Sequence, residues 1–286
     1  MNGVSCTNNA PMGLNKQIFD LIMSLWPVYK VGLWAGRQPV IGRLLRPAFS
    51  AKIHQVTMIP VNETIQQGEQ TILPYSLLEQ LVIQASARFM MTECVCRSHE
   101  GCQEHSTGLG CLFLGDGAAQ IHPSLGRRCS VNEAISHIHR GMDEGLYPLI
   151  AHTVIDALTL GIPYKRMLTV CFCCECCCMV YRGLDLGPRS LLQVVQRLPG
   201  LKISMGEGCE ACEECIAKCP VGAIIHTDHN AQIGEDCIGC GICIKACPYG
   251  VIKMEVPKEQ DILAGFFERV RSYADITAGP KARNLP

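Results

Sequence analysis

The sequence predicts an α+β fold: a mixed, largely helical, cysteine-rich region, then a small internally repeated unit and a C-terminal helix. Apolar stripes at helical spacing follow Pro74 and again follow Ser130, where Ser130 and Glu133 form a capping box. Residues 54–65 alternate in the way that predicts a strand, and residues 166–170 are a short run that predicts a buried strand. Helices and strands therefore share one region, as an α+β fold requires.

The 286 residues are enough for one large or two medium domains. We expect an apolar, basic arm at 1–50, a cysteine-rich α+β domain at 51–199 and the repeated unit at 200–257. A terminal helix and tail at 258–286 complete the chain. Further helices are expected at 147–161, after Pro188 and at 262–273, and Pro60 suggests that the 54–65 strand lies near a sheet edge.

The repeated unit carries the pattern C-x₂-C-x₂-C-x₃-C-P twice, between Cys209 and Pro248. The two copies are offset by 28 residues (237 − 209), and the match extends to their flanks. Each half therefore predicts a strand, a cysteine loop, a short helix and a strand. Zinc would use C-x₂-C pairs without the trailing C-P, and disulfides are the other rival interpretation.

This pattern resembles a bacterial-type two-cluster ferredoxin, and the resemblance covers roughly residues 200–257. In such proteins three cysteines of one loop and the C-P cysteine of the other half hold each 4Fe–4S cluster. The resemblance implies one cluster on Cys209, Cys212, Cys215 and Cys247, and a second on Cys237, Cys240, Cys243 and Cys219.

A second group of cysteines follows the predicted helix after Pro74. Its members are Cys94, Cys96, Cys102 and Cys111, in a glycine-rich stretch of eighteen residues. The spacing is not that of ferredoxins, but four thiolates so close together predict a third cluster. Arg97 could neutralise the charge of such a cluster or lie in solvent, and His99 and His105 could be ligands or neighbours of ligands.

A third group places six cysteines in eight residues: Cys171, Cys173, Cys174, Cys176, Cys177 and Cys178. Neighbouring side chains on an extended chain point in opposite directions, so all six cannot reach one cubane. Either some of them reach back to the 94–111 segment, or they hold a non-cubane or larger cluster; a soft-metal buffer is a further alternative. Cys6 and Cys129 are expected to be non-ligands. Of the 20 cysteines, enough remain for about four clusters in all.

The charge distribution suggests docking between charged partners rather than nucleic-acid binding. The formal net charge is −1. Residues 1–50 carry five basic side chains and one acidic one (5 − 1 = +4), whereas residues 200–256 carry eight acidic and four basic ones (4 − 8 = −4). Clustered thiols at ligand spacing, without an export signal, predict a reducing cytoplasm and an anaerobic setting.

Residues 16–50 are apolar and basic and contain both tryptophans. A membrane-surface helix is one interpretation. A pair of helices that packs on the core or on a partner subunit is the preferred one, because Pro27, Gly32, Gly36 and Pro39 interrupt the pattern.

The whole chain is similar in arrangement to multi-cluster 4Fe–4S proteins of strict anaerobes. That likeness implies electron transfer as a subunit or partner of a larger oxidoreductase, with a flavoprotein or a dehydrogenase or reductase subunit as partner. The sequence shows no Rossmann fingerprint, P-loop or haem motif. Two alternatives are a reductase with a catalytic cluster at 171–178, with Glu175, His99, His105 and Arg97 as candidates for proton delivery, and a cluster carrier or scaffold.

Overall fold

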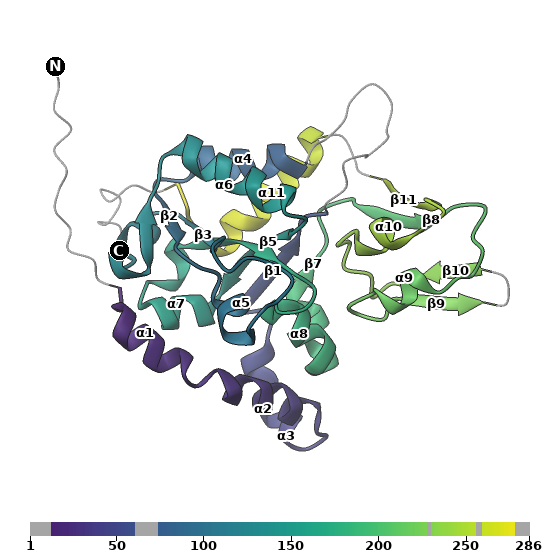
Figure 1. The fold of residues 1–286 in the computed structure, drawn as a ribbon, viewed down its shortest axis with the longest axis horizontal. Coiled ribbons are helices and arrows are strands. Elements are labelled where there is room, and N and C mark those ends of the chain that lie inside the picture. The colour runs from purple at the N-terminus through teal and green to yellow at the C-terminus, as the bar shows by residue number, and fades with distance from the viewer. Residues whose placement is uncertain (1–12, 61–73, 228–229, 256–258, 278–286) are drawn as a thin grey trace.

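The fold is described from a computed structural model, which covers residues 13–60, 74–227, 230–255 and 259–277. The prediction for Cys6 lies outside these residues. The protein is α+β, with a mixed seven-stranded sheet and a smaller unit beside it (Figure 1).

The large sheet has the strand order β4-β2-β3-β6-β5-β1-β7. All neighbours pair antiparallel except β1 and β7, which pair parallel. Its strands are β1 (His54–Met58), β2 (Arg88–Met91), β3 (Leu112–Leu114), β4 (Gly126–Arg128), β5 (Tyr147–Thr153), β6 (Leu168–Cys173) and β7 (Val195–Gln196).

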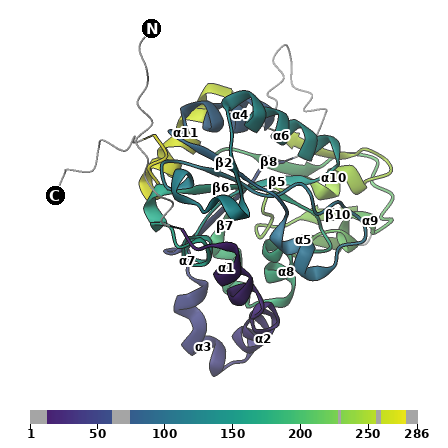
Figure 2. The ribbon, with the colours of Figure 1, turned by 60° about the vertical axis from the view of Figure 1, so that its left-hand side comes forward.

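Helices cover both faces of this sheet (Figures 1 and 2). One face carries α4 (Pro74–Gln84), α6 (Val131–Asp143) and α11 (Glu259–Tyr273). The opposite face carries α1 (Lys16–Met23), α2 (Trp26–Arg37), α7 (Val154–Leu160) and α8 (Met179–Leu186). Shorter helices are α3 (Ile41–Leu45), α5 (Val95–Glu100) and the 3₁₀ turns η1 (Arg46–Phe49), η2 (Ala118–Gln120), η3 (Pro123–Leu125), η4 (Tyr164–Arg166) and η5 (Arg189–Val194).

Strand β6 shows how the sheet separates the two layers. Leu168, Val170 and Phe172 point into the core beneath α4, α6 and α11. Cys171 and Cys173 alternate with them and point to the face covered by α8. The period-two alternation of a strand thus delivers apolar residues to one layer and thiols to the other.

Several predicted elements are present and some are wrong. The capping box of Ser130 and Glu133 starts α6 as predicted, and the predicted C-terminal helix is α11. The helix expected at 147–161 is instead strand β5 followed by α7. Pairing of β5 with strands on both sides decides its conformation, and its residues from Tyr147 to His152 are buried.

One smaller correction concerns the segment after Pro188, whereas the predicted place of β1 is confirmed. Strand β1 lies near the sheet edge, because only β7 pairs beyond it. The expected helix after Pro188 is the 3₁₀ turn η5, and the chain then enters β7. The two findings share one cause, since β7 is the short strand that closes this side of the sheet.

The C-terminal repeat unit (residues 200–255) has the predicted strand, loop, helix and strand in each half. Its elements are β8 (Lys202–Met205), α9 (Glu214–Ala217), β9 (Ile224–Thr227), β10 (Asn230–Ile233), α10 (Ile242–Ala246) and β11 (Ile252–Glu255). The outer strands β8 and β11 pair antiparallel, as do β9 and β10. The first strand of the first repeat, β8, therefore pairs with the last strand of the second repeat, β11. This pairing joins the two halves into one unit.

The two cysteine loops share a backbone conformation with positive φ at two positions, but only the second loop has glycine at these positions. Gly239 and Gly241 have φ of 72° and 80°. At the same places in the first repeat, Ala211 and Glu213 have φ of 49° and 65°. Non-glycine residues in this left-handed region are strained by about 1–2 kcal/mol each. Both loops therefore adopt the same shape even where the local residues oppose it.

Gly141 on α6 is expected to be intolerant of a side chain. A Cβ at this position would overlap the ring of Phe172, the β6 residue between Cys171 and Cys173. We expect Gly141→Ala to lower the free energy of unfolding by about 1–3 kcal/mol through overpacking. Thermal unfolding checks this, with Gly32→Ala as the control because nothing lies within 4 Å of a Cβ built there. An unchanged Tm for Gly141→Ala would contradict the tight contact.

Candidate metal centres

The cysteines of the C-terminal repeat unit line two small cavities. One cavity is lined by Cys209, Cys212, Cys215 and Cys247. The other is lined by Cys219, Cys237, Cys240 and Cys243. Each set joins three cysteines of one loop to the C-P cysteine of the other half. Backbone amides face these sulfurs, and the amide of Ala223 donates to Cys219 Sγ at 3.3 Å.

A four-cysteine group lies at the end of β6. Its members are Cys102, Cys174, Cys176 and Cys177, whose Sγ atoms lie within 4.8 Å of one another. Cys176 is exposed and lies 3.7 Å from Cys102 and 3.5 Å from Cys177, sulfur to sulfur. Four thiols at this separation suit a tetrahedral metal ion or an iron–sulfur cluster.

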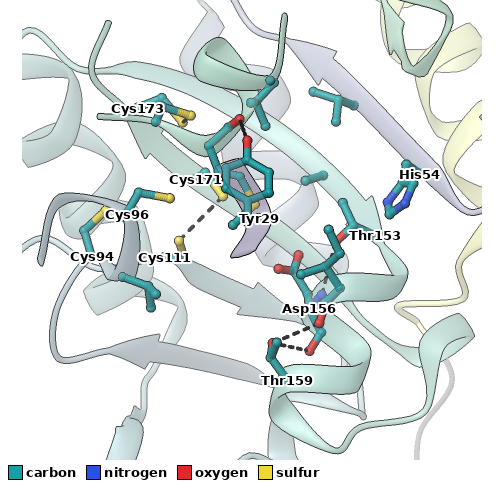
Figure 3. Close-up of a pocket in the computed structure, with 18 of the residues that line it drawn as sticks. Tyr29, His54, Cys94, Cys96, Cys111, Thr153, Asp156, Thr159, Cys171 and Cys173 are labelled. Atoms are coloured by element: carbon teal, nitrogen blue, oxygen red, sulfur yellow. Dashed lines mark hydrogen bonds between the residues drawn. The ribbon is translucent and has the colours of Figure 1, made fainter. Parts of the chain in front are cut away.

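Seven thiols line a cavity, which we call the chamber, with a volume of about 230 Å³ (Figure 3). One of them, Cys174, also belongs to the four-cysteine group. The other six are the chamber cysteines: Cys94, Cys96, Cys111, Cys171, Cys173 and Cys178. Two pairs are in direct contact: Cys111 with Cys171 at 3.5 Å, and Cys173 with Cys178 at 2.9 Å. Helix α5 with the residue before it, the residue before β3, strand β6 and the residue before α8 each contribute to the set.

The structure thus groups the middle cysteines differently from the sequence-based prediction. Cys102 lies with the 174–177 thiols, whereas the other three cysteines of the 94–111 segment lie with Cys171, Cys173 and Cys178. The cause is the geometry of β6 and the turn that follows it. The strand sends Cys171 and Cys173 to one face, and the turn after it brings Cys174, Cys176 and Cys177 to the other side.

Arg97 lies between the two groups and is fully buried. Its guanidinium donates to three backbone carbonyls: those of Ser106 (2.7 Å), Phe172 (2.7 Å) and Leu109 (2.5 Å). No carboxylate pairs with it among the described residues. Burial acts to lower the pKa of Arg97, but the neighbouring sulfurs, foremost that of Cys94, raise it above its usual value. A buried cation that pairs with no carboxylate needs negative charge nearby from another source. Metal centres ligated by the surrounding thiolates would supply this charge.

Burial strongly disfavours charge on several thiols. It raises the pKa of Cys174 to about 12, and that of Cys240 and of Cys243 also to about 12. A hydrogen bond from Cys96 lowers the pKa of Cys94 to about 7. Thiols with such raised pKa values become thiolates only when a cation replaces the proton. The donor sets therefore fit bound iron, which would release these protons.

Tyr181 lies where the chamber approaches the C-terminal repeat unit. It is buried in one cluster of packed side chains together with Cys173, Cys178 and Cys240. Its hydroxyl oxygen is buried and has no hydrogen-bond partner among the described residues. A buried hydroxyl without a partner is costly, and a cluster sulfur would supply an acceptor. This orphaned hydroxyl is a second sign that the cysteines around it hold a cluster.

Beyond the sulfurs, the chamber continues between the sheet and α1 and α2 as a mainly apolar space. Phe19, Met23, Trp26 and Leu33 line it from the two helices. Figure 3 shows Asp156 and Thr159 at the end away from the cysteines. Burial, with a smaller effect of Cys171, raises the pKa of Asp156 to about 7, and Thr169 donates to its carboxylate at 2.9 Å.

The four residues considered for proton delivery are Arg97, His99, His105 and Glu175, and the structure shows the surroundings of each. Arg97 is buried rather than solvated, as described above. His99 stacks on Trp26 with ring centroids 5.3 Å apart. His105 is half-buried in the loop beside Cys102. Glu175 accepts from the hydroxyl of Tyr147 at 3.0 Å and pairs with Lys218 at 3.8 Å. Sequence reasoning missed Tyr181 and Asp156, because an isolated tyrosine or acid carries no spacing signal.

Comparison with known protein families gives one match. The model of the 4Fe-4S binding domain matches residues 233–253, the second half of the repeat. Neither the curated proteins nor the solved structures give a significant match. The chain is therefore an iron–sulfur binding protein with at least one 4Fe–4S motif and a further four-cysteine group that could hold a cluster.

Tyr181→Phe is expected to make the reduction potential of one cluster more negative. The hydroxyl would donate to a cluster sulfur, and such a bond stabilises the reduced, more negative state. Loss of about 1 kcal/mol corresponds to roughly 40 mV for a one-electron step. A redox titration followed by EPR measures the shift, with the wild-type iron content as the check on folding. Unchanged potentials for all clusters would show that the hydroxyl does not reach a sulfur.

Proposed function

We propose that the protein is an electron-transfer iron–sulfur protein with four centres. Two are 4Fe–4S clusters of the C-terminal repeat unit, held by the two cysteine sets that line its cavities. The third uses the four-cysteine group, and the fourth uses the chamber cysteines. The thiolates would hold the iron, and each cluster would supply one-electron chemistry.

One observation carries this proposal: cysteines of the repeat unit and of the chamber belong to the same buried layer of side chains. Cys240 of the repeat unit packs in one cluster with Cys173 and Cys178 of the chamber, and Tyr181 lies among them. On the other side of the sheet, Cys174 and Cys177 share a core with Cys215 and Cys243. Short distances between centres are what an electron relay requires.

A redox protein is the proposed partner, a flavoprotein or a dehydrogenase or reductase subunit, in a reducing cytoplasm. The repeat unit offers exposed acidic side chains around its first loop: Glu207, Glu210, Glu213 and Glu214. Cys212 in the same loop is exposed as well. An acidic surface beside a solvent-exposed cluster would steer a basic partner to the point where electrons enter or leave.

Anaerobic iron and sulfide analysis with EPR of the reduced protein tests the proposal. We expect more than about 12 irons per chain and spin coupling between neighbouring clusters, since four cubanes would carry about 16. A chain that holds only about eight irons, with free thiols in the middle region, would contradict the four-centre relay. Ready loss of the clusters to an apo-acceptor would favour a carrier instead.

The chamber favours one alternative, a reductase whose catalytic cluster is ligated by chamber cysteines. The observation behind it is the apolar space that continues from the sulfurs toward Asp156. A pure relay has no need of such a space. A change in the EPR spectrum of one cluster on addition of a small substrate would support the alternative. EPR spectra of all four clusters that stay unchanged on addition of small molecules would oppose it.

A further inference from the structure

Helices α1, α2 and α3 present an apolar face away from the rest of the molecule. Nine large apolar side chains on or beside them are 44% to 76% exposed. We call this the outer face, and its residues are Ile18, Leu21, Leu25, Val28, Val31, Trp34, Val40, Ile41 and Leu44. The whole described chain has fourteen exposed large apolar side chains, so most of them gather on this one segment.

Basic side chains accompany the outer face. Arg37, Arg43 and Arg46 are exposed, and no carboxylate pairs with them among the described residues. Lys30 is exposed as well and pairs with Glu100 at 2.8 Å. The only acidic residue in the first fifty is Asp20. The segment therefore combines apolar surface with an excess of positive charge.

The opposite sides of the same helices are anchored in the protein. Phe19, Met23, Trp26 and Leu33 are buried. Trp26 also donates to Glu100 at 2.6 Å, and the hydroxyl of Tyr29 donates to the carbonyl of Met179 at 2.6 Å. None of the described helices is long and apolar enough to cross a membrane alone; α1 and α2 together pass that test of length and composition, with a bend of 40°.

We propose that the outer face lies on the surface of an anionic lipid bilayer. Apolar side chains on one side of a helix, with Arg beside them, suit insertion into the boundary between headgroups and acyl chains. Trp34 is the kind of side chain that prefers this boundary. Because the inner sides of α1 and α2 are held in the core, the helices lie along the membrane rather than through it. Arginines without carboxylate partners favour anionic lipid over a purely apolar protein partner.

Flotation with vesicles tests this. The full chain should bind vesicles of phosphatidylglycerol and phosphatidylcholine, and bind pure phosphatidylcholine far more weakly. Val31→Glu with Trp34→Glu should abolish binding. Its matched control, Ile83→Glu with Ile225→Glu, changes two equally exposed apolar residues elsewhere and should bind as the wild type does. Arg37→Gln, Arg43→Gln and Arg46→Gln together should weaken binding on the order of 100-fold.

Three outcomes would overturn the proposal: no vesicle binding by the wild type, unchanged binding by the outer-face variant, or equal binding to neutral and anionic vesicles. Self-association that the outer-face variant abolishes, without vesicle binding, would instead make the face a protein interface. The assay is repeated with Cys177→Ser, which leaves the outer face intact. Continued binding by that variant separates docking from the proposed cluster chemistry.

A second inference concerns the chamber and rests on the proposed function. The same two helices that form the outer face also wall the apolar part of the chamber, with Met23 and Leu33 on their inner sides. One layer of helices therefore separates a lipid-facing surface from a cavity that is lined at its other end by cysteine thiols. We infer that the chamber takes a lipid-soluble quinone. Two reduced clusters would each give one electron, and two protons from water would complete the conversion of quinone to quinol.

Cavity-filling variants test the second inference. With a soluble naphthoquinone, the reduced wild type should be reoxidised and form one quinol for two electrons lost. Met23→Trp or Leu33→Trp should slow this at least tenfold with the iron content unchanged. Ile83→Trp, at an exposed position of α4 that does not line the chamber, is the matched control and should react as the wild type does. Equal rates in all variants would place the reaction at an exposed cluster, and absence of reoxidation would exclude the quinone.

Discussion

Cys177→Ser is expected to remove one cluster, about four irons per chain, and leave the signals of the repeat unit in place. Cys177 is one of four thiols whose Sγ atoms lie within 4.8 Å of one another, so its loss leaves three ligands for that centre. Serine preserves the volume but is a poor ligand for iron, which prefers thiolate in these clusters. Iron analysis of the anaerobically reconstituted protein and EPR of its reduced form measure the effect.

Cys129→Ser is the matched control. Cys129 belongs to neither middle group and lies just before α6, where burial and then the Glu133 carboxylate raise its pKa. Its replacement should leave the iron content and the spectra unchanged. The prediction is wrong if Cys177→Ser keeps the full iron content, or if Cys129→Ser loses iron as well. In that second case the middle cysteines would act as an unspecific metal store.

Arg97→Gln is expected to lower the free energy of unfolding by about 3–5 kcal/mol and to remove the iron of both middle centres. The guanidinium is the cation buried between the two cysteine groups, and its three hydrogen bonds hold the carbonyls of Ser106, Phe172 and Leu109. Glutamine can keep part of this network but not the charge. Two negatively charged centres would then face each other without compensation.

Arg88 offers a matched control, because it also donates to three backbone carbonyls, those of Val82, Ile83 and Ala85. It lies away from both middle cysteine groups. Arg88→Gln should lose stability in chemical denaturation but keep its iron, whereas Arg97→Gln should lose both. Equal iron content in the two variants would mean that Arg97 serves only to hold its loop. Arg97→Lys, which keeps the charge, should retain more iron than Arg97→Gln.

The sequence predicts the repeat unit well because its information is local. Cysteine spacing, the C-P steps and the matching flanks all lie within one half or its copy, and each half has the predicted elements. Helix α6 is predicted for the same reason, since its capping box lies within four residues. Strand β5 is not, because its conformation comes from pairing with β1 and β6, which lie outside the segment itself.

The middle cysteines show the same limit. Spacing alone joins Cys102 to Cys94, yet α5 and its loop carry Cys102 to the four-cysteine group instead. The alternation argument for residues 171–178 does anticipate that neighbouring thiols separate. It does not predict which cysteine group each thiol joins, because the packing of β6 against α8 depends on the arrangement of the whole sheet. Tyr181 and Asp156 can be recognised as residues of the site only from their burial near the cysteines.

The octapeptide from Cys171 to Cys178 supplies two sites from one short segment. Three of its cysteines are chamber cysteines and three belong to the four-cysteine group, and Cys174 of that group also lines the chamber. Insertion or deletion of one residue within this segment would displace ligands of both sets at once, as a register slip moves the side chains of a strand to the opposite face. A change in the length of the segment therefore affects both middle centres, whereas substitution of a single cysteine affects one of them.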